Sequence, residues 1–86
     1  MIILYHKNFE KDFKKLSAKR KEKCKERLAL FFQDEFGLIL GNHPLRGKYQ
    51  GYRSINIGGD LRALYKKTAR NAVIFVAVNT HNKLYK

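Results

Sequence analysis

Two histidines and several arginines lie in the second half of the chain, and their types suit the cleavage of RNA. His43 and His81 can transfer protons, because the pKa of histidine lies near neutrality. Arg53 and Arg62 suit a phosphate, because a guanidinium can donate hydrogen bonds to two of its oxygens at once. RNA carries its own nucleophile, the 2′-hydroxyl, so an enzyme needs a base, an acid and cations that stabilise the phosphorane. Together with Asp60, these residues are the right types for that reaction.

Each of these residues also has a purely structural interpretation. His43 precedes Pro44 and can simply shape a loop, and Asp60 follows two glycines and can be an ordinary turn residue. Arg62 can be surface charge, and a histidine near the end of the sequence can be incidental. Residue types alone therefore allow this chemistry without selecting it.

Positive charge dominates the composition. The 86 residues hold 19 Lys and Arg against 7 Asp and Glu, a formal net charge of +12. The excess is uneven, because residues 37–86 contain Asp60 as their one acid beside nine Lys and Arg. Such a field attracts polyanions, and nucleic acid is the usual one. A solubilising surface is the alternative interpretation, and an acidic protein made alongside this one is a second candidate partner.

Other classes of protein fit the sequence poorly. No apolar run approaches the roughly 18 residues of a membrane span, and the N-terminus lacks the pattern of a signal peptide. Cys24 is the one cysteine, so it is expected in the core rather than in a disulfide. The spacings typical of metal sites and phosphate loops are absent, so neither a metal nor a cofactor is expected. We therefore expect one cytoplasmic domain, residues 1–86, without membrane association.

The first half of the chain predicts a strand and two helices. Residues 1–5 are apolar and β-prone, and Asn8 can cap a following helix by accepting a hydrogen bond from a backbone N–H. One face of this helix carries Phe9, Phe13 and Leu16. A second helix is expected over residues 18–35 with Ser17 as its cap. Its inward-facing residues are Cys24, Leu28, Phe31 and Phe32.

The second half predicts a β-meander, because the hydrophobic period changes to two. The expected segments are a glycine-containing connection at 37–51, a strand at 52–57, a turn at Gly58-Gly59, a strand at 60–67, a turn at 68–71, a central strand at 72–78 covered on both sides, and a polar tail at 79–85.

The predicted fold is therefore α+β, with the order β-α-α-β-β-β. Two helices cannot bury their apolar stripes alone, so both are expected on one face of a small, mainly antiparallel sheet. By alternation along the first meander strand, Arg53 shares a face with Ile55 and Ile57. The opposite face is expected to carry the polar residues Ser54, Asn56, Arg62 and Lys66.

A family resemblance rests on three motifs, which together cover roughly half of the chain: HPLRGKYQGYR at 43–53, GDLRALYK at 59–66 and THNKLY at 80–85. In order and spacing they resemble the YafQ branch of the RelE superfamily, the toxins of bacterial type II toxin–antitoxin pairs. The predicted element order is that of the RelE-like fold.

The resemblance implies a small, metal-independent endoribonuclease that cleaves mRNA in the ribosomal A site. It also implies a cognate acidic antitoxin that holds the toxin inactive, and a free toxin that is monomeric. His43, Asp60 and His81 correspond to active-site positions, with His81 as the acid and His43 or Asp60 as the base or its orienting group. Arg62 matches an arginine with which RelE stabilises phosphate charge, and Tyr85 stands where the family has an aromatic residue that can stack on a base. The other residues expected to contact mRNA or ribosomal RNA are Arg53, Lys48, Lys66 and Lys67.

This chain departs from the family pattern at three positions. YafQ-type sequences carry an acid and a histidine where this chain has Ser54 and Asn56, and an arginine where it has Ala77. Asn56 can hydrogen-bond but cannot transfer a proton near neutral pH, so the base assignment stays open between His43 and Asp60. Two alternatives therefore stand: a ParE-like toxin that poisons DNA gyrase without cutting RNA, and an inactive relative that only binds an antitoxin or nucleic acid.

Overall fold

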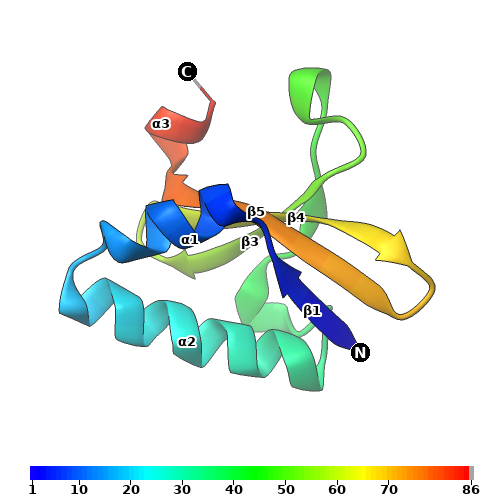
Figure 1. Cartoon of the computed structure of the whole chain (residues 1–86), viewed down its shortest axis with the longest axis horizontal. Helices are drawn as coiled ribbons and strands as arrows, with labels where there is room; N and C mark the ends of the chain where they lie inside the picture. The colour runs from blue at the N-terminus through cyan, green and yellow to red at the C-terminus, as the bar shows by residue number, and fades with distance from the viewer. Residues whose placement is uncertain (86) are drawn as a thin grey trace.

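A long helix and a shorter one pack against one sheet in the computed structural model, which describes residues 1–85 (Figure 1). Within these residues the sheet has five strands in the order β1-β5-β4-β3-β2. Strand β1 runs parallel to β5, and the other neighbours are antiparallel. The elements are β1 (Ile2–Tyr5), α1 (Lys7–Lys14), α2 (Ala18–Gln33), the 3-10 helix η1 (Leu38–Leu40), β2 (His43–Pro44), the 3-10 helix η2 (Gly47–Tyr49), β3 (Arg53–Gly58), β4 (Leu61–Ala69), β5 (Ala72–Thr80) and α3 (His81–Leu84).

This architecture confirms the predicted α+β class and the order of strand, helix, helix and three antiparallel strands. The sequence did not predict β2, and it predicted a polar tail where β5 continues and α3 follows. These two short elements carry His43 and His81, two of the predicted site residues. None of the helices in the described part of the chain is long and apolar enough to cross a membrane.

The helix caps are side chains that accept backbone N–H groups. Helix α1 is capped by His6, whose Nδ1 accepts the N–H of Asn8 at 3.0 Å. The prediction that Asn8 is the cap is therefore wrong, because a ring nitrogen two residues earlier takes that role. Ser17 caps α2 as predicted, with its Oγ accepting the N–H of Arg20 at 3.2 Å. Helix α2 ends at Gln33, two residues before the predicted end.

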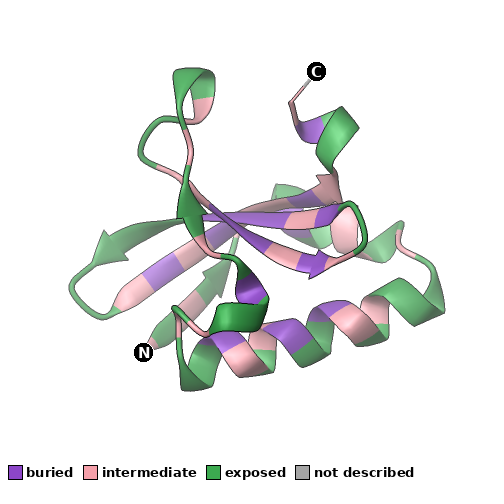
Figure 2. Cartoon of the chain, turned by 180° about the vertical axis from the view of Figure 1, so that it is seen from behind, coloured by how far each residue is buried: buried purple, intermediate pink, exposed green. Residues whose placement is uncertain are grey.

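The core lies between α2 and the sheet, where buried residues form a stripe along the helix (Figure 2). Phe31 of α2 packs edge-on against Tyr65 of β4 and Phe75 of β5, with ring centroids 4.9 and 5.1 Å apart. Cys24 lies two turns earlier on the same face, and burial raises the pKa of its thiol to about 11. Phe32 was predicted to face inward, but it is 56% exposed, because each helical step turns the side chain by about 100°.

Strand β5 has two different neighbours along one edge. β1 pairs with Ala72–Phe75, and α1 then lies along the rest of β5, where Asp12 Oδ2 accepts the N–H of Val78 at 3.1 Å. A helix side chain thus takes the hydrogen bond that a longer strand would have taken. β5 lies between β1 and β4 and the central strand is β4, so the predicted central place of β5 is wrong; its predicted cover on both faces is also incomplete, because Ile74 and Val76 are only half-buried.

The turn between β3 and β4 lies at Gly59-Asp60, one residue later than predicted. Gly59 has a φ of 56°, in the left-handed region that favours glycine. The strand register is irregular between Asn56 and Gly58. This irregularity interrupts the two-residue alternation just before Asp60, with consequences for the site.

Candidate active site

Four of the predicted site residues line one open cleft of about 430 Å³. His43 comes from β2, Arg62 from β4 and His81 from α3, and Tyr85 directly follows α3. Figure 1 shows α3 and the loop that carries η2 on the side of the sheet opposite α2, and residues of α3 and of the segment leading into η2 line the cleft. Its complete lining is His43, Pro44, Leu45, Arg46, Ser54, Arg62, His81 and Tyr85.

Strand register brings these residues together. One row across β2, β3, β4 and β5 consists of His43, Ser54, Leu64 and Ala77. The next row across β3, β4 and β5 consists of Asn56, Arg62 and Asn79. Directly opposite residues in an antiparallel pair project from the same face of the sheet. His43 and Arg62 therefore reach one face from different strands, although β2 is only two residues long.

The ring of His43 is oriented by the backbone. Its Nδ1 lies 3.0 Å from the carbonyl oxygen of Gly41. A carbonyl only accepts hydrogen bonds, so Nδ1 carries the proton in this contact. Nε2 of the neutral ring then holds the lone pair. This tautomer suits His43 to accept a proton from a group in the cleft.

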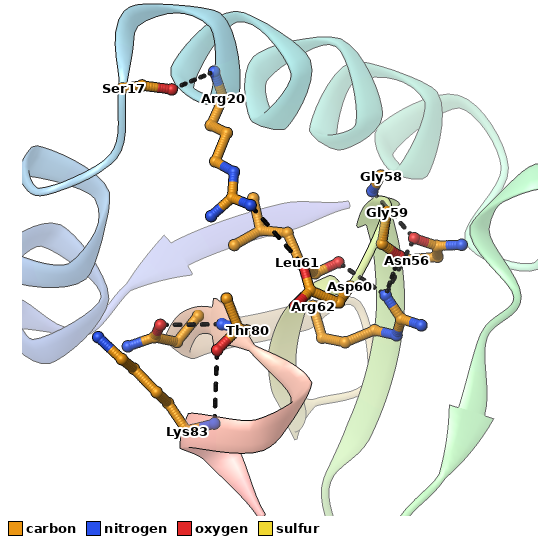
Figure 3. A network of polar contacts seen from close by, with 11 residues as sticks. Ser17, Arg20, Asn56, Gly58, Gly59, Asp60, Leu61, Arg62, Thr80 and Lys83 are labelled. Atoms are coloured by element: carbon orange, nitrogen blue, oxygen red, sulfur yellow. Dashed lines mark hydrogen bonds and ion pairs between the residues drawn. The ribbon is translucent and has the colours of Figure 1, made fainter.

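His81 is held at the first position of α3. Its backbone N–H donates to the carbonyl of Asp60 at 2.8 Å, which ties α3 to the turn between β3 and β4. Thr80 caps the helix, with its Oγ1 accepting the N–H of Lys83 at 3.4 Å (Figure 3). The His81 ring lies 4.6 Å from the ring of Tyr85. The imidazole and an aromatic face are thus presented together at the cleft.

Arg62 is anchored at the same turn (Figure 3). Its Nη1 donates to the carbonyls of Gly59 at 2.8 Å and Leu61 at 3.1 Å, and it lies 3.3 Å from Asn56 Oδ1. Asn56 Oδ1 also accepts the N–H of Gly58 at 2.9 Å. Asn56 therefore links the turn to the arginine, and the guanidinium lies against the cleft with one of its nitrogens fixed.

The structure does not bring the carboxylate of Asp60 into the cleft. Asp60 Oδ1 lies 3.7 Å from Nη2 of Arg20 on α2, and both side chains are at least half exposed (Figure 3). Its contribution to the site is the backbone carbonyl that holds His81. Within the described residues, no three His, Cys, Asp or Glu side chains lie close enough together to hold a metal ion.

Arg53 also lies outside the cleft, in a network on the α2 side of the sheet. Its Nε donates to Asn42 Oδ1 at 2.7 Å, and its guanidinium lies 5.3 Å from the ring of Phe36. Asn42 Nδ2 donates to the hydroxyl of Tyr65 at 2.7 Å, and that hydroxyl donates to Glu35 Oε2 at 2.7 Å. Burial is the main cause that raises the pKa of Tyr65. The network fixes the residue directly before His43.

The three lysines predicted to bind RNA lie on two different elements, Lys48 on η2 and Lys66 and Lys67 on β4. Lys48 Nζ lies 5.3 Å from the ring centre of Tyr49, and Lys66 Nζ lies 5.3 Å from that of Tyr52. Lys67 is exposed on β4. None of the three lines the cleft.

Sequence reasoning missed Leu45 and Arg46 as cleft residues, whereas it placed Ser54 on the same face as Arg62, as observed. Arg46 follows directly in the motif that begins at His43, so the motif itself was the available signal. Ser54 is fully buried, and its Oγ has no hydrogen-bond partner in the described structure. Its position opposite His43 depends on β2, which the hydrophobic pattern does not reveal.

Comparison with known proteins identifies the family. The sequence-family model described as "Bacterial toxin of type II toxin-antitoxin system, YafQ" matches residues 1–86. The chain belongs to the YafQ family. No match is found among curated proteins. The earlier resemblance to YafQ toxins is confirmed, and this protein is a type II toxin.

Solved structures agree with membership in the YafQ family. A histidine-to-glutamine variant of YafQ from E. coli is 28% identical, with a TM-score of 0.79 over 98% of this chain and 97% of that chain. YafQ in the E. coli DinJ–YafQ toxin–antitoxin complex is 27% identical, with a TM-score of 0.78 over 98% of this chain and 96% of that chain. A YoeB/ParE toxin from Agrobacterium tumefaciens is 19% identical, with a TM-score of 0.78 over 94% of this chain and 99% of that chain, and it shares the fold.

Proposed function

We propose that this YafQ-family toxin is a metal-independent endoribonuclease that cleaves mRNA in the ribosomal A site by attack of the 2′-hydroxyl. The observation that carries the proposal is the cleft where His43, Arg62, His81 and Tyr85 meet from separate elements. Two imidazoles beside a guanidinium and an aromatic ring provide the proton transfers, the charge stabilisation and the base contact that this reaction needs.

Each side chain has one role in the proposed reaction. His43 Nε2 takes the proton of the 2′-hydroxyl, because Nδ1 is directed at the carbonyl of Gly41. The oxygen attacks phosphorus, Arg62 stabilises the charge on the phosphorane, and His81 protonates the departing 5′ oxygen. Tyr85 stacks on a base next to the scissile bond. Asp60 is the weaker candidate for the base, because its carboxylate is directed at Arg20 and not at the cleft.

The ribosome and an antitoxin complete the proposed function. The cleft is shallow and open, so the ribosome is expected to hold the mRNA in the reactive orientation. The net charge of +12 suits contacts with ribosomal RNA, and it equally suits the binding of a cognate acidic antitoxin. The complex of a relative with the antitoxin DinJ supports such a partner. We also propose that the free toxin is monomeric and acts in the cytoplasm.

The decisive experiment maps new RNA 5′ ends in a translating extract. Wild-type protein is compared with His81→Gln and with Lys83→Gln, a matched control on the same helix whose side chain does not line the cleft. We expect cuts at ribosome-occupied codons with wild type and with Lys83→Gln. A loss of about 10²-fold or more is expected with His81→Gln, as is usual when a general acid is removed.

Two other outcomes would change the proposal. Equal cutting by wild type and His81→Gln would keep the ribonuclease and remove His81 as its acid. No cuts from any variant, while expression still arrests growth, would contradict the ribonuclease and direct attention to DNA gyrase.

A further inference from the structure

A second hollow adjoins the cleft and has no role in the chemistry described so far. It has a volume of about 480 Å³ and lies between α1 and the segment that carries η2. Lys11 of α1 and Lys15, the C-cap of this helix, line one side, and Lys48, Tyr49 and Tyr52 line the opposite side. Sequence reasoning did not assign Lys11 or Lys15 to RNA binding, although their i, i+4 spacing places them on one side of α1 and its C-cap.

A line of aromatic rings joins the cleft to this hollow. The His81 ring is 4.6 Å from the Tyr85 ring, which is 5.8 Å from that of Tyr49. Tyr49 is in turn 6.2 Å from Tyr52. The first two rings line the cleft and the last two line the hollow. The half-buried tyrosines therefore form one continuous aromatic path on the surface.

Positive charge accompanies this path. Lys48 Nζ lies 5.3 Å from the Tyr49 ring centre, and Lys66 Nζ lies 5.3 Å from that of Tyr52. Lys11 and Lys15 are exposed on the other wall of the hollow. Asp12 is the one acid among the lining residues, and its Oδ2 accepts the Val78 N–H. The hollow thus combines cations with aromatic surface, as do sites that bind single-stranded nucleic acid.

We propose that this hollow binds the single-stranded RNA that continues beyond the cleaved bond. Bases of the neighbouring nucleotides stack against Tyr49 and Tyr52, and their phosphates contact Lys11 and Lys15. The identity of this RNA as the substrate strand rests on the proposed function. The carboxylates of an acidic protein segment would pair with the lysines but would not stack on the tyrosine rings. The aromatic path therefore favours RNA as the ligand of this hollow.

The test measures binding of a fluorescent, uncleavable 2′-O-methyl oligoribonucleotide to the full chain, by anisotropy at several salt concentrations. The variant Lys11→Ala/Lys15→Ala removes the lysines of one wall. Its matched control, Lys14→Ala/Lys25→Ala, removes the same charge from exposed lysines of a different groove between α1 and α2. A third variant, Tyr52→Leu, removes one ring and keeps an apolar side chain.

We expect Lys11→Ala/Lys15→Ala to bind the oligonucleotide at least about tenfold more weakly. The slope of log binding constant against log salt concentration should become shallower by roughly 1.4, since each phosphate contact on a single strand contributes about 0.7. The control should lose less than about threefold, which is the effect of the general field. Tyr52→Leu should bind about 5- to 100-fold more weakly with an unchanged salt slope, because a stacking contact is not ionic.

Three results would overturn the inference. One is equal loss in the two lysine variants, which would leave only a general charge effect. Another is the absence of oligonucleotide binding by the wild type. The third is equally tight binding of a poly-glutamate peptide that Tyr52→Leu does not weaken, which would assign the hollow to an acidic protein. Because the oligonucleotide cannot be cut and no ribosome is present, these results are independent of whether the protein is a ribonuclease.

Discussion

His43 and His81 are positioned by hydrogen bonds to backbone carbonyl groups. A side-chain substitution does not remove a backbone carbonyl, so these hydrogen bonds do not depend on the identity of one neighbouring side chain. The ring of His43 contacts the carbonyl of Gly41, and the N–H of His81 binds the carbonyl of Asp60. Gly41 has a φ of 52°, so its carbonyl direction depends on a left-handed conformation. The proposed base and acid are therefore oriented by a glycine and by a turn, and neither relies on a carboxylate.

We predict that Asp60→Asn keeps nearly full ribonuclease activity, within about threefold of wild type. The carboxylate is half exposed and faces Arg20, and such ion pairs contribute about 0–1 kcal/mol to stability. The carbonyl that holds His81 is unchanged by the substitution. Cleavage of a ribosome-bound message under single-turnover conditions is the measurement, with His81→Gln as the impaired reference. A loss of activity as large as that of His81→Gln would show that the carboxylate of Asp60 takes part in catalysis.

The sequence predicted some site residues and misplaced others for identifiable reasons. Alternation along β3 predicts that Arg53 shares a face with Ile55, and the structure confirms this. The separate prediction that Arg53 contacts RNA beside Arg62 is inconsistent with that alternation, because Arg62 lies on the opposite face. Asp60 was assigned to the site through the family resemblance, whereas the structure directs its carboxylate towards Arg20, in the turn that follows the irregular register between Asn56 and Gly58. Local periodicity cannot reveal a break of this kind, since it depends on the partner strand.

At the scale of elements, the segment before β2 is fixed by side chains from distant parts of the chain. Asn42 binds Tyr65 and Arg53, and its Nδ2 also donates to the carbonyl of Glu35 at 3.0 Å. β2 itself pairs with β3 through two residues only. The network therefore compensates for a strand too short to hold His43 on its own. Neither β2 nor this network has a periodic signal, which is why sequence reasoning described the region as a connection.

We predict that Tyr65→Phe lowers the free energy of unfolding by about 1–2 kcal/mol, because a buried hydrogen-bonded hydroxyl is lost and Glu35 loses a donor. Urea unfolding followed by circular dichroism measures this change. Cleavage should also fall several-fold, since Asn42 loses one of its anchors. In a His43→Gln background the same substitution should have no further effect on cleavage. An equal loss in both backgrounds would mean that the network does not act through His43.

We predict that Asp12→Ala lowers the free energy of unfolding by about 1.5–3 kcal/mol, because the N–H of Val78 loses a charged acceptor. Asp12→Asn keeps an acceptor oxygen and serves as the control, with a smaller loss. Amide hydrogen exchange at Val78 should become faster in Asp12→Ala, with little change at Val73, which β1 covers. Unchanged exchange at Val78 would show that α1 does not protect this edge.

At the scale of the whole molecule, groups with raised pKa values make the fold sensitive to alkali. Burial raises the pKa of Cys24 from 9.0 to about 11 and also raises the pKa of Tyr5 and Tyr65. Above pH 9 the unfolded thiol loses its proton while the folded thiol keeps it. Stability from this group is therefore complete below pH 9 and is lost as pH rises towards 11.

We accordingly predict that the urea midpoint falls between pH 9 and pH 11. Cys24→Ala should show a shallower fall over the same range, even if it is less stable at neutral pH, because the titrating thiol is absent. The measurement is a series of urea unfolding curves from pH 7 to pH 11. Parallel pH dependences for the wild type and Cys24→Ala would exclude the thiol as a cause.

The parallel pairing of β1 with β5 has a consequence for the biosynthesis of a toxic chain. Ile2 pairs with Ala72 and Tyr5 with Phe75, so β1 can pair only after a segment about 70 residues later has been translated. Contacts between residues so distant in sequence form late in folding. His81 follows β5 directly, so the cleft cannot assemble on a nascent chain that still lacks this strand. The proposed cleft is therefore incomplete in any chain that has been translated only as far as β4.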